Sequence, residues 1–121
     1  MKAFIRVMKA LSDPNRVRVV KLLQAGELCV CEITEVLGLA QSTVSKHLKI
    51  LEDAGLVKKN RQGTWMIYSL ADGSESAYAG TMLHQLGSWL DDDSELNRMR
   101  KALPAAAALR DFPLKSERIG S

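Results

Sequence analysis

A five-residue link that begins with glycine, GLAQS at 38–42, joins two segments of helical periodicity and constrains the fold more than any other feature. The segment before the link covers about residues 29–37. The segment after it begins near Ser42, ends before Gly55 and repeats apolar residues at Val44, Leu48 and Leu51. At about 100° per residue these three side chains lie on one side of a helix. So short a link favours two helices packed at an angle in a helix-turn-helix.

The segments around this pair predict the rest of the fold. LVKKN and TWMIYSL flank RQG, which is typical of a β-hairpin with a glycine-containing loop. Helices are expected over 2–11 and 14–25, separated by SDPNR, in which Ser12 or Asp13 can cap the second helix. Further helices are expected over 75–90 and 94–102. The sequence therefore predicts a mainly α domain with a small β-hairpin (α+β), a winged helix-turn-helix over residues 1–102, and a loosely held tail over 103–121.

Composition and charge exclude several other classes of protein. The 121 residues carry a net charge of +3 and a pI near 9.0, which favours an anionic partner. No apolar run reaches the roughly 18 residues of a membrane span, and the N-terminus lacks a signal-peptide layout, so a cytoplasmic protein with no membrane partner is expected. The chain also has no glycine-rich phosphate loop and no four-ligand zinc spacing. We therefore expect no enzyme.

The helix after the link carries a polar face suited to double-stranded DNA. Hydroxyl side chains lie near its N-terminal end and lysines lie further along, opposite the apolar stripe. Hydroxyls hydrogen-bond bases or phosphates, and lysines neutralise phosphates. The expected contacts are Ser42, Thr43, Ser45, Lys46 and His47, with Lys49 and the hairpin's Lys59 and Arg61 on phosphates. A winged helix that binds another protein instead of DNA stays open as an alternative.

Four blocks of the chain resemble blocks of one protein family and occur in the same order as in that family. ALSDPNRVRVVKLL, GELCVCEI, AQSTVSKHLKILEDAGLV and RQGTWMIYSL are similar to the ArsR family of metal- and metalloid-responsive repressors, over about residues 3–90. The resemblance implies a homodimer formed through the first and fifth helices. It also implies an imperfect inverted-repeat operator and release from it by an inducer. The implied interface residues are Phe4, Met8, Tyr78, Met82, Leu86 and Trp89.

Cys29 and Cys31 are the only cysteines, and both are expected to be free thiols. ELCVCEI resembles the metalloid-binding stretch of the arsenite-responsive members, in which a third cysteine follows; here that place holds Thr34. The resemblance implies arsenite or antimonite as inducer and no resident cofactor. Two thiolates leave the third donor open among water, an exogenous thiol, Glu32 and Thr34.

The spacing of the two cysteines predicts a route from inducer to DNA. In a helix that begins at Cys29, the two sulfurs point about 160° apart, so one ligand reaches both only if the first turn unwinds. That distortion would displace the DNA-reading helix. Three alternatives stay open: a buried structural Cys29 with an incidental Cys31, a redox response through a strained disulfide, and a thiophilic ion such as Cd(II), Pb(II) or Hg(II). The fifth helix, with His84 followed by Asp91–Asp93, is expected to hold no metal.

Overall fold

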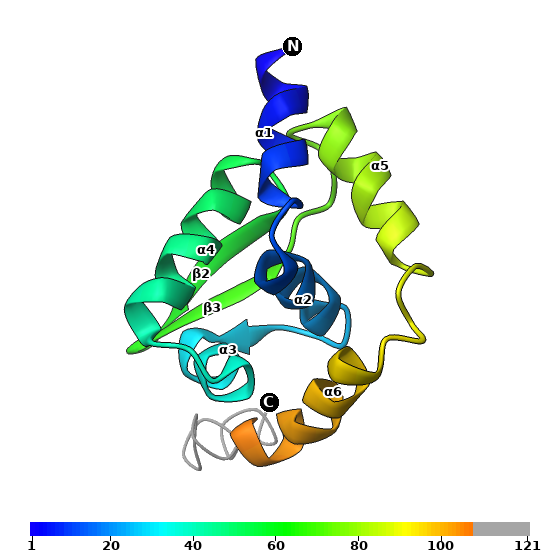
Figure 1. Ribbon diagram of the computed structural model, residues 1–121. Coiled ribbons are helices and arrows are strands. Elements are labelled where there is room, and N and C mark those ends of the chain that lie inside the picture. The colour runs from blue at the N-terminus through cyan, green and yellow to red at the C-terminus, as the bar shows by residue number, and fades with distance from the viewer. Residues whose placement is uncertain (108–121) are drawn as a thin grey trace.

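Six helices and three strands make up the part of the chain that the computed structural model describes, residues 1–107 (Figure 1). In chain order they are α1 Lys2–Ala10, α2 Pro14–Leu23, β1 Leu28–Cys29, α3 Val30–Leu37, α4 Gln41–Asp53, β2 Val57–Gln62, β3 Trp65–Leu70, α5 Ala77–Leu86 and α6 Ser94–Ala107. The predicted winged helix-turn-helix is confirmed: α3 and α4 form the helix pair, and β2 and β3 form the wing.

The helix-turn-helix is held together by the expected apolar stripe. Val44, Leu48 and Leu51 of α4 are fully buried in the core, and burying each contributes about 1.5–3 kcal/mol. α3 ends where Gly38 adopts a left-handed conformation with φ of +69°, which a residue without Cβ reaches at little cost. Asp13 caps α2, as predicted, by accepting hydrogen bonds from the N–H groups of Asn15 and Arg16.

The sheet differs from the predicted hairpin in two ways. Gln62 pairs with Trp65, so the hairpin loop is the two residues Gly63–Thr64, and Arg61 and Gln62 belong to β2 rather than to an RQG loop. Gly63 has a positive φ of +63°, which a two-residue hairpin loop requires. The second difference is β1, which pairs antiparallel with β3 and gives the strand order β1-β3-β2.

The C-terminal third also departs from the prediction. α5 ends at Leu86, four residues earlier than expected, and a series of turns follows. α6 continues through Pro104 to Ala107, so the change in composition at that proline does not end the helix. Residues 108–121 of the expected tail lie outside the described residues, and the predicted division at 102/103 stays a prediction.

α1 and α5 lie at one end of the molecule, and α3 and α6 lie at the other (Figure 1). α3 contacts α4 on one side and α6 on another, and α1 contacts both α4 and α5. The helix at which the two cysteines lie, α3, is thus packed between α4 and α6. The helices of the expected dimer interface lie elsewhere.

Candidate nucleic-acid interface and thiol site

The outer face of α4 is exposed where the sequence predicts DNA contacts. Ser42, Thr43, Ser45, Lys46 and Lys49 are exposed, while the apolar stripe of the same helix is fully buried. The helix begins at Gln41 and its N-cap, Ala40, has no side-chain capping bond. The N–H groups of Gln41 and Ser42 thus have no side-chain cap and remain available for a phosphate, whereas that of Thr43 donates to the Ala40 carbonyl.

His47 is half-buried and connects α4 to α2. Its Nδ1 lies 3.2 Å from a guanidinium nitrogen of Arg16, so the ring accepts this bond in the tautomer protonated at Nε2. The Nε of Arg16 also donates to the carbonyl oxygen of Ala10, at 2.8 Å. His47 therefore orients the recognition helix against α2 and, through Arg16, against the end of α1; its expected contact with DNA stays a prediction.

Two of the expected phosphate-binding lysines already have acidic neighbours. The ammonium of Lys49 lies 3.2 Å from Asp53, and that of Lys59 lies 3.7 Å from Glu52. Exposed ion pairs contribute little to stability, so a DNA phosphate competes with them readily. Lys46 is exposed and forms no ion pair with any described residue.

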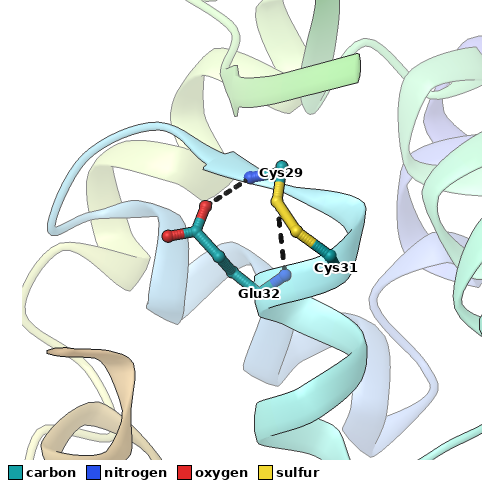
Figure 2. The surroundings of a disulfide bond; sticks show 3 residues. All are labelled: Cys29, Cys31 and Glu32. Atoms are coloured by element: carbon teal, nitrogen blue, oxygen red, sulfur yellow. Dashed lines mark hydrogen bonds between the residues drawn. A yellow bond between two sulfur atoms is a disulfide. The ribbon is translucent and has the colours of Figure 1, made fainter. Parts of the chain in front are cut away.

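Cys29 is the N-cap of α3 and not its first helical residue, which corrects the predicted geometry. Its backbone is extended, with φ −85° and ψ 164°, and the helix begins at Val30. The two sulfurs therefore do not diverge by about 160°; they are joined in a disulfide, with Cα atoms 5.4 Å apart (Figure 2). That Cα separation is usual for a disulfide. The expectation of two free thiols differs from the structure for the same reason: the cap brings the sulfurs together without unwinding the helix.

A reciprocal pair of hydrogen bonds fixes Cys29 to the first turn of α3. The Cys29 N–H donates to Oε1 of Glu32 at 2.7 Å, and the Glu32 N–H donates to the Cys29 sulfur at 3.4 Å (Figure 2). This is a capping box with sulfur in place of a hydroxyl oxygen. Glu32 and Cys29 are each 1% exposed, whereas Cys31 is half-buried. One cysteine is therefore locked in the interior and the other has an accessible side.

The described residues supply two sulfurs but no assembled third ligand. No group of three or more His, Cys, Asp or Glu side chains within residues 1–107 is arranged to hold a metal ion. Thr34 lies three residues after Cys31 on the same helix, and its hydroxyl oxygen is buried without a hydrogen-bond partner. After reduction of the disulfide, the two cysteines offer a soft, thiol-seeking centre two sulfurs from the protein.

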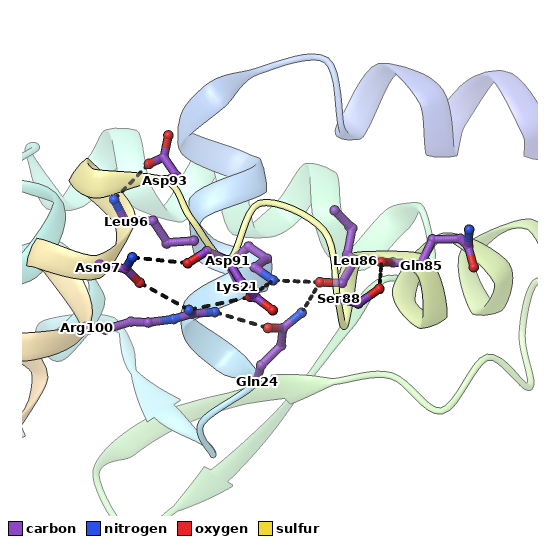
Figure 3. Close-up of polar contacts among 10 residues, drawn as sticks. All are labelled: Lys21, Gln24, Gln85, Leu86, Ser88, Asp91, Asp93, Leu96, Asn97 and Arg100. Atoms are coloured by element: carbon purple, nitrogen blue, oxygen red, sulfur yellow. Dashed lines mark hydrogen bonds and ion pairs between the residues drawn. The ribbon is translucent and has the colours of Figure 1, made fainter.

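A polar network that sequence reasoning missed surrounds Lys21 (Figure 3). The Lys21 side chain is fully buried, and its ammonium donates to the Leu86 carbonyl at 2.6 Å and to Asp91 at 2.8 Å. Gln24 donates to the same carbonyl, and Arg100 donates to Gln24. The network joins the end of α5, the turns that follow it and the middle of α6 to the C-terminal end of α2. The only sequence signal for it is a lysine inside the apolar run VVKLL.

Asp91 is therefore part of the structure and not only solvated charge. The hydrogen bond from Lys21 holds the pKa of Asp91 below its ordinary value, and the Arg100 charge adds to this effect. Asp93 accepts a hydrogen bond from the Leu96 N–H at 2.8 Å and so caps α6. Two of the three consecutive aspartates thus hold the α5–α6 connection in place.

Comparison with known proteins identifies the family. Residues 13–59 match the sequence profile described as "Bacterial regulatory protein, arsR family". The arsenical resistance operon repressor of Bacillus subtilis is 42% identical over 73 residues, which are 60% of this chain and 70% of that protein. This chain belongs to the ArsR family. It is therefore a DNA-binding transcriptional regulator and not an enzyme.

Other ArsR relatives differ in the resistance that their names give. A cadmium resistance regulatory protein, a CadC homologue from Staphylococcus aureus, is 40% identical over 68 residues, 55% of this chain and 56% of that protein.

A solved homodimeric winged helix-turn-helix domain from Mycobacterium bovis superposes with a TM-score of 0.62 at 28% identity, over 75% of this chain and 81% of that one. No helix among residues 1–107 has the length and apolarity to cross a membrane.

The expected ArsR dimer residues divide into an exposed and a buried set. Phe4 is 40% exposed, and Tyr78 and Trp89 are each 47% exposed. The rings of Phe4 and Tyr78 pack edge to face with centroids 5.5 Å apart, which joins α1 to α5 in one apolar surface. Met8 and Met82 are half-buried, and Leu86 is already buried within its own chain. Of these six residues, the three aromatic ones are therefore the exposed ones.

Proposed function

We propose that this ArsR-family protein is a repressor that leaves its operator when trivalent arsenic or antimony binds Cys29 and Cys31. The observation that carries the proposal is the place where the two sulfurs meet: the N-cap of α3, the helix that packs against the recognition helix α4. The operator is an imperfect inverted repeat read by two protomers. The inducer binds only after the disulfide is reduced, because thiolates are the ligands.

Ligand binding acts on a residue that belongs to two elements at once. Cys29 caps α3 and also pairs with Ile67 of the wing strand β3. A centre bonded to both sulfurs fixes the distance and the angle between them, which two free thiols leave open. Because Cys29 is buried, this constraint strains the cap and the strand pairing together. Both α4 and the wing then shift relative to DNA.

Two side chains of α3 are candidates for the third donor. The Thr34 hydroxyl is buried and without a hydrogen-bond partner, so a bound centre would satisfy it. The Glu32 carboxylate is committed to the Cys29 N–H, so its recruitment would break the capping box and loosen the first turn of α3. Glu32 as donor therefore links binding to distortion more directly, and Thr34 as donor leaves the cap intact.

A divalent thiophilic ion is a second candidate inducer. The protein contributes two sulfurs where a three-thiolate pyramid needs three, and Cd(II), Pb(II) or Hg(II) accepts sulfur in more varied geometries. The cadmium-resistance relative supports this candidate. A divalent ion would bind the same two cysteines and act on α4 in the same way, so the two candidate inducers differ only in the ion.

Anisotropy of a labelled duplex from the gene's own upstream region tests the proposal. The phosphine-reduced full chain should bind the duplex and leave it as arsenite is added, whereas the Cys29→Ser and Cys31→Ser variants should bind and stay. Serine is a preferred N-cap, so the first variant keeps α3 capped. Release by Cd(II) but not by arsenite would favour the second candidate. Reduced protein that binds no duplex would favour the protein-binding alternative.

A further inference from the structure

The disulfide leaves every element of the DNA-reading unit in place. With Cys29 and Cys31 bonded, α3 runs its full length from Val30 to Leu37, both hydrogen bonds of the capping box are present, and β1 still pairs with β3. The α4 stripe remains fully buried. Oxidation is thus compatible with the winged helix, in contrast to the expected distortion by a strained disulfide.

The two sulfurs differ in access to an oxidant. Cys29 is 1% exposed and is the cap of the helix, whereas Cys31 is half-buried and faces partly outward. A hydroperoxide therefore reaches the Cys31 thiolate first. The Cα atoms of Cys29 and Cys31 lie 5.4 Å apart, a usual separation for a disulfide, so the Cys29 sulfur is placed to attack the oxidised Cys31 sulfur.

We propose that a hydroperoxide oxidises this cysteine pair to a disulfide that keeps the protein on DNA and makes it unresponsive to the soft inducer. The Cys31 thiolate attacks one peroxide oxygen, the O–O bond breaks, and the leaving oxygen takes a proton to become water or an alcohol. The Cys29 thiolate then attacks the sulfenic sulfur of Cys31 and expels hydroxide, which is protonated to water. Two thiols lose two electrons and two protons in total, and the peroxide gains them.

The consequence for the inducer follows from the loss of both thiolates. Sulfur in a disulfide carries no thiolate charge, and the thiolate is the form that binds soft centres. The oxidised protein therefore keeps a complete recognition unit but has lost its inducer ligands. This inference rests on the proposed function for its effect on induction, whereas the order of thiol attack and the DNA affinity of the oxidised form do not depend on it.

The experiment compares reduced and peroxide-treated full-length protein on the labelled operator duplex. We expect the dissociation constants of the two forms to agree within about threefold, which is less than 1 kcal/mol. Arsenite should release the reduced form, should leave the oxidised form bound, and should release it again after phosphine reduction. A drop of about tenfold or more in DNA affinity on oxidation would overturn the inference. So would release of the oxidised form by arsenite.

A thiol-trapping arm tests the order of attack. With peroxide present, dimedone should label the Cys29→Ser variant, in which the Cys31 sulfenic acid has no partner, and label the Cys31→Ser variant weakly. The opposite pattern would overturn the assignment of Cys31 as the attacking thiol. If neither arsenite nor Cd(II) released the reduced wild-type protein from DNA, the proposed function would be overturned. The proposed loss of inducer response on oxidation would be overturned with it. Failure of the inference alone is therefore distinguishable, because it leaves the reduced protein responsive.

Discussion

Cys29 lies directly opposite Ile67 in the antiparallel pairing of β1 with β3, so the buried cysteine that caps α3 is also paired with a strand of the wing. Cys29 is therefore connected to both elements that are proposed to contact DNA: to the wing through β3, and to α4 through α3. Two residues of strand pairing are too few to hold on their own. The capping box with Glu32 and the disulfide to Cys31 both hold Cys29 to the first turn of α3.

Replacing Glu32 with alanine should destabilise the protein by about 1–3 kcal/mol, because the buried Cys29 N–H loses its acceptor. Urea denaturation of the oxidised proteins, followed by circular dichroism, measures this difference. Glu35→Ala is the matched control, since Glu35 is an exposed residue of the same helix and should cost less than about 0.5 kcal/mol. Equal effects of the two substitutions would contradict the role given to the cap.

Local sequence signals were enough to predict the helix-turn-helix and the presence of the β-hairpin. The α4 stripe, the cap at Asp13 and the hairpin are local features, and the structure contains each of them. The predicted geometry of the two cysteines was wrong because the helix boundary was misplaced by one residue. With the start of α3 at Val30 and not at Cys29, the Cys29 side chain is a cap and not part of the helix. Helix ends carry an uncertainty of that size from sequence alone.

β1 and the Lys21 network were beyond sequence reasoning for a different reason. A strand of two residues is too short to show an alternating pattern, and it exists only because β3 lies beside it. Lys21 stands in an apolar run, and its partners, the Leu86 carbonyl and Asp91, are 65 and 70 residues away. Only the packed chain brings these groups together.

Thr34→Cys should make the protein more sensitive to arsenite, because it supplies the third thiolate that a trivalent centre favours. We expect the arsenite concentration for half-release of DNA to fall by about tenfold or more. Thr34→Val is the control for shape. Because the Thr34 hydroxyl is buried without a partner, valine should leave the free energy of unfolding unchanged or raise it by about 1 kcal/mol. If valine also raises the arsenite concentration needed, the hydroxyl is the third donor.

Lys46→Ala should weaken binding to every duplex by a similar factor and should lower the salt dependence of binding. The slope of log K against log salt should fall by about one for each phosphate contact removed. Lys46 is exposed and has no acidic neighbour among the described ion pairs, so nothing else in the described fold should suffer. Lys101→Ala, an exposed lysine of α6, is the control. An unchanged slope for Lys46→Ala would remove α4 from the DNA interface.

Asp91→Asn should reduce the loss of stability in acid. The pKa of Asp91 is lowered in the fold by the hydrogen bond from Lys21, so its contribution to stability is present above the ordinary value of 3.8 and is lost as pH falls through the lower folded value. Thermal unfolding midpoints should therefore be lower for the variant at pH 6 and converge with the wild type at acid pH. Asp92→Asn, a change in the exposed neighbour, should keep the wild-type pH profile.

Tyr78→Glu should shift the protein from dimer to monomer and weaken operator binding together. Its ring is 47% exposed and packs on the Phe4 ring, so a partner subunit that covers this surface would bury a carboxylate without a counter-charge. Sedimentation velocity measures the assembly state, and duplex anisotropy measures DNA affinity. Ala102→Glu adds the same charge at an exposed position of α6 and should leave both unchanged. A Tyr78→Glu protein that stays dimeric would place the subunit interface away from the Phe4–Tyr78 contact, since a buried, unpaired carboxylate at its centre is not tolerated.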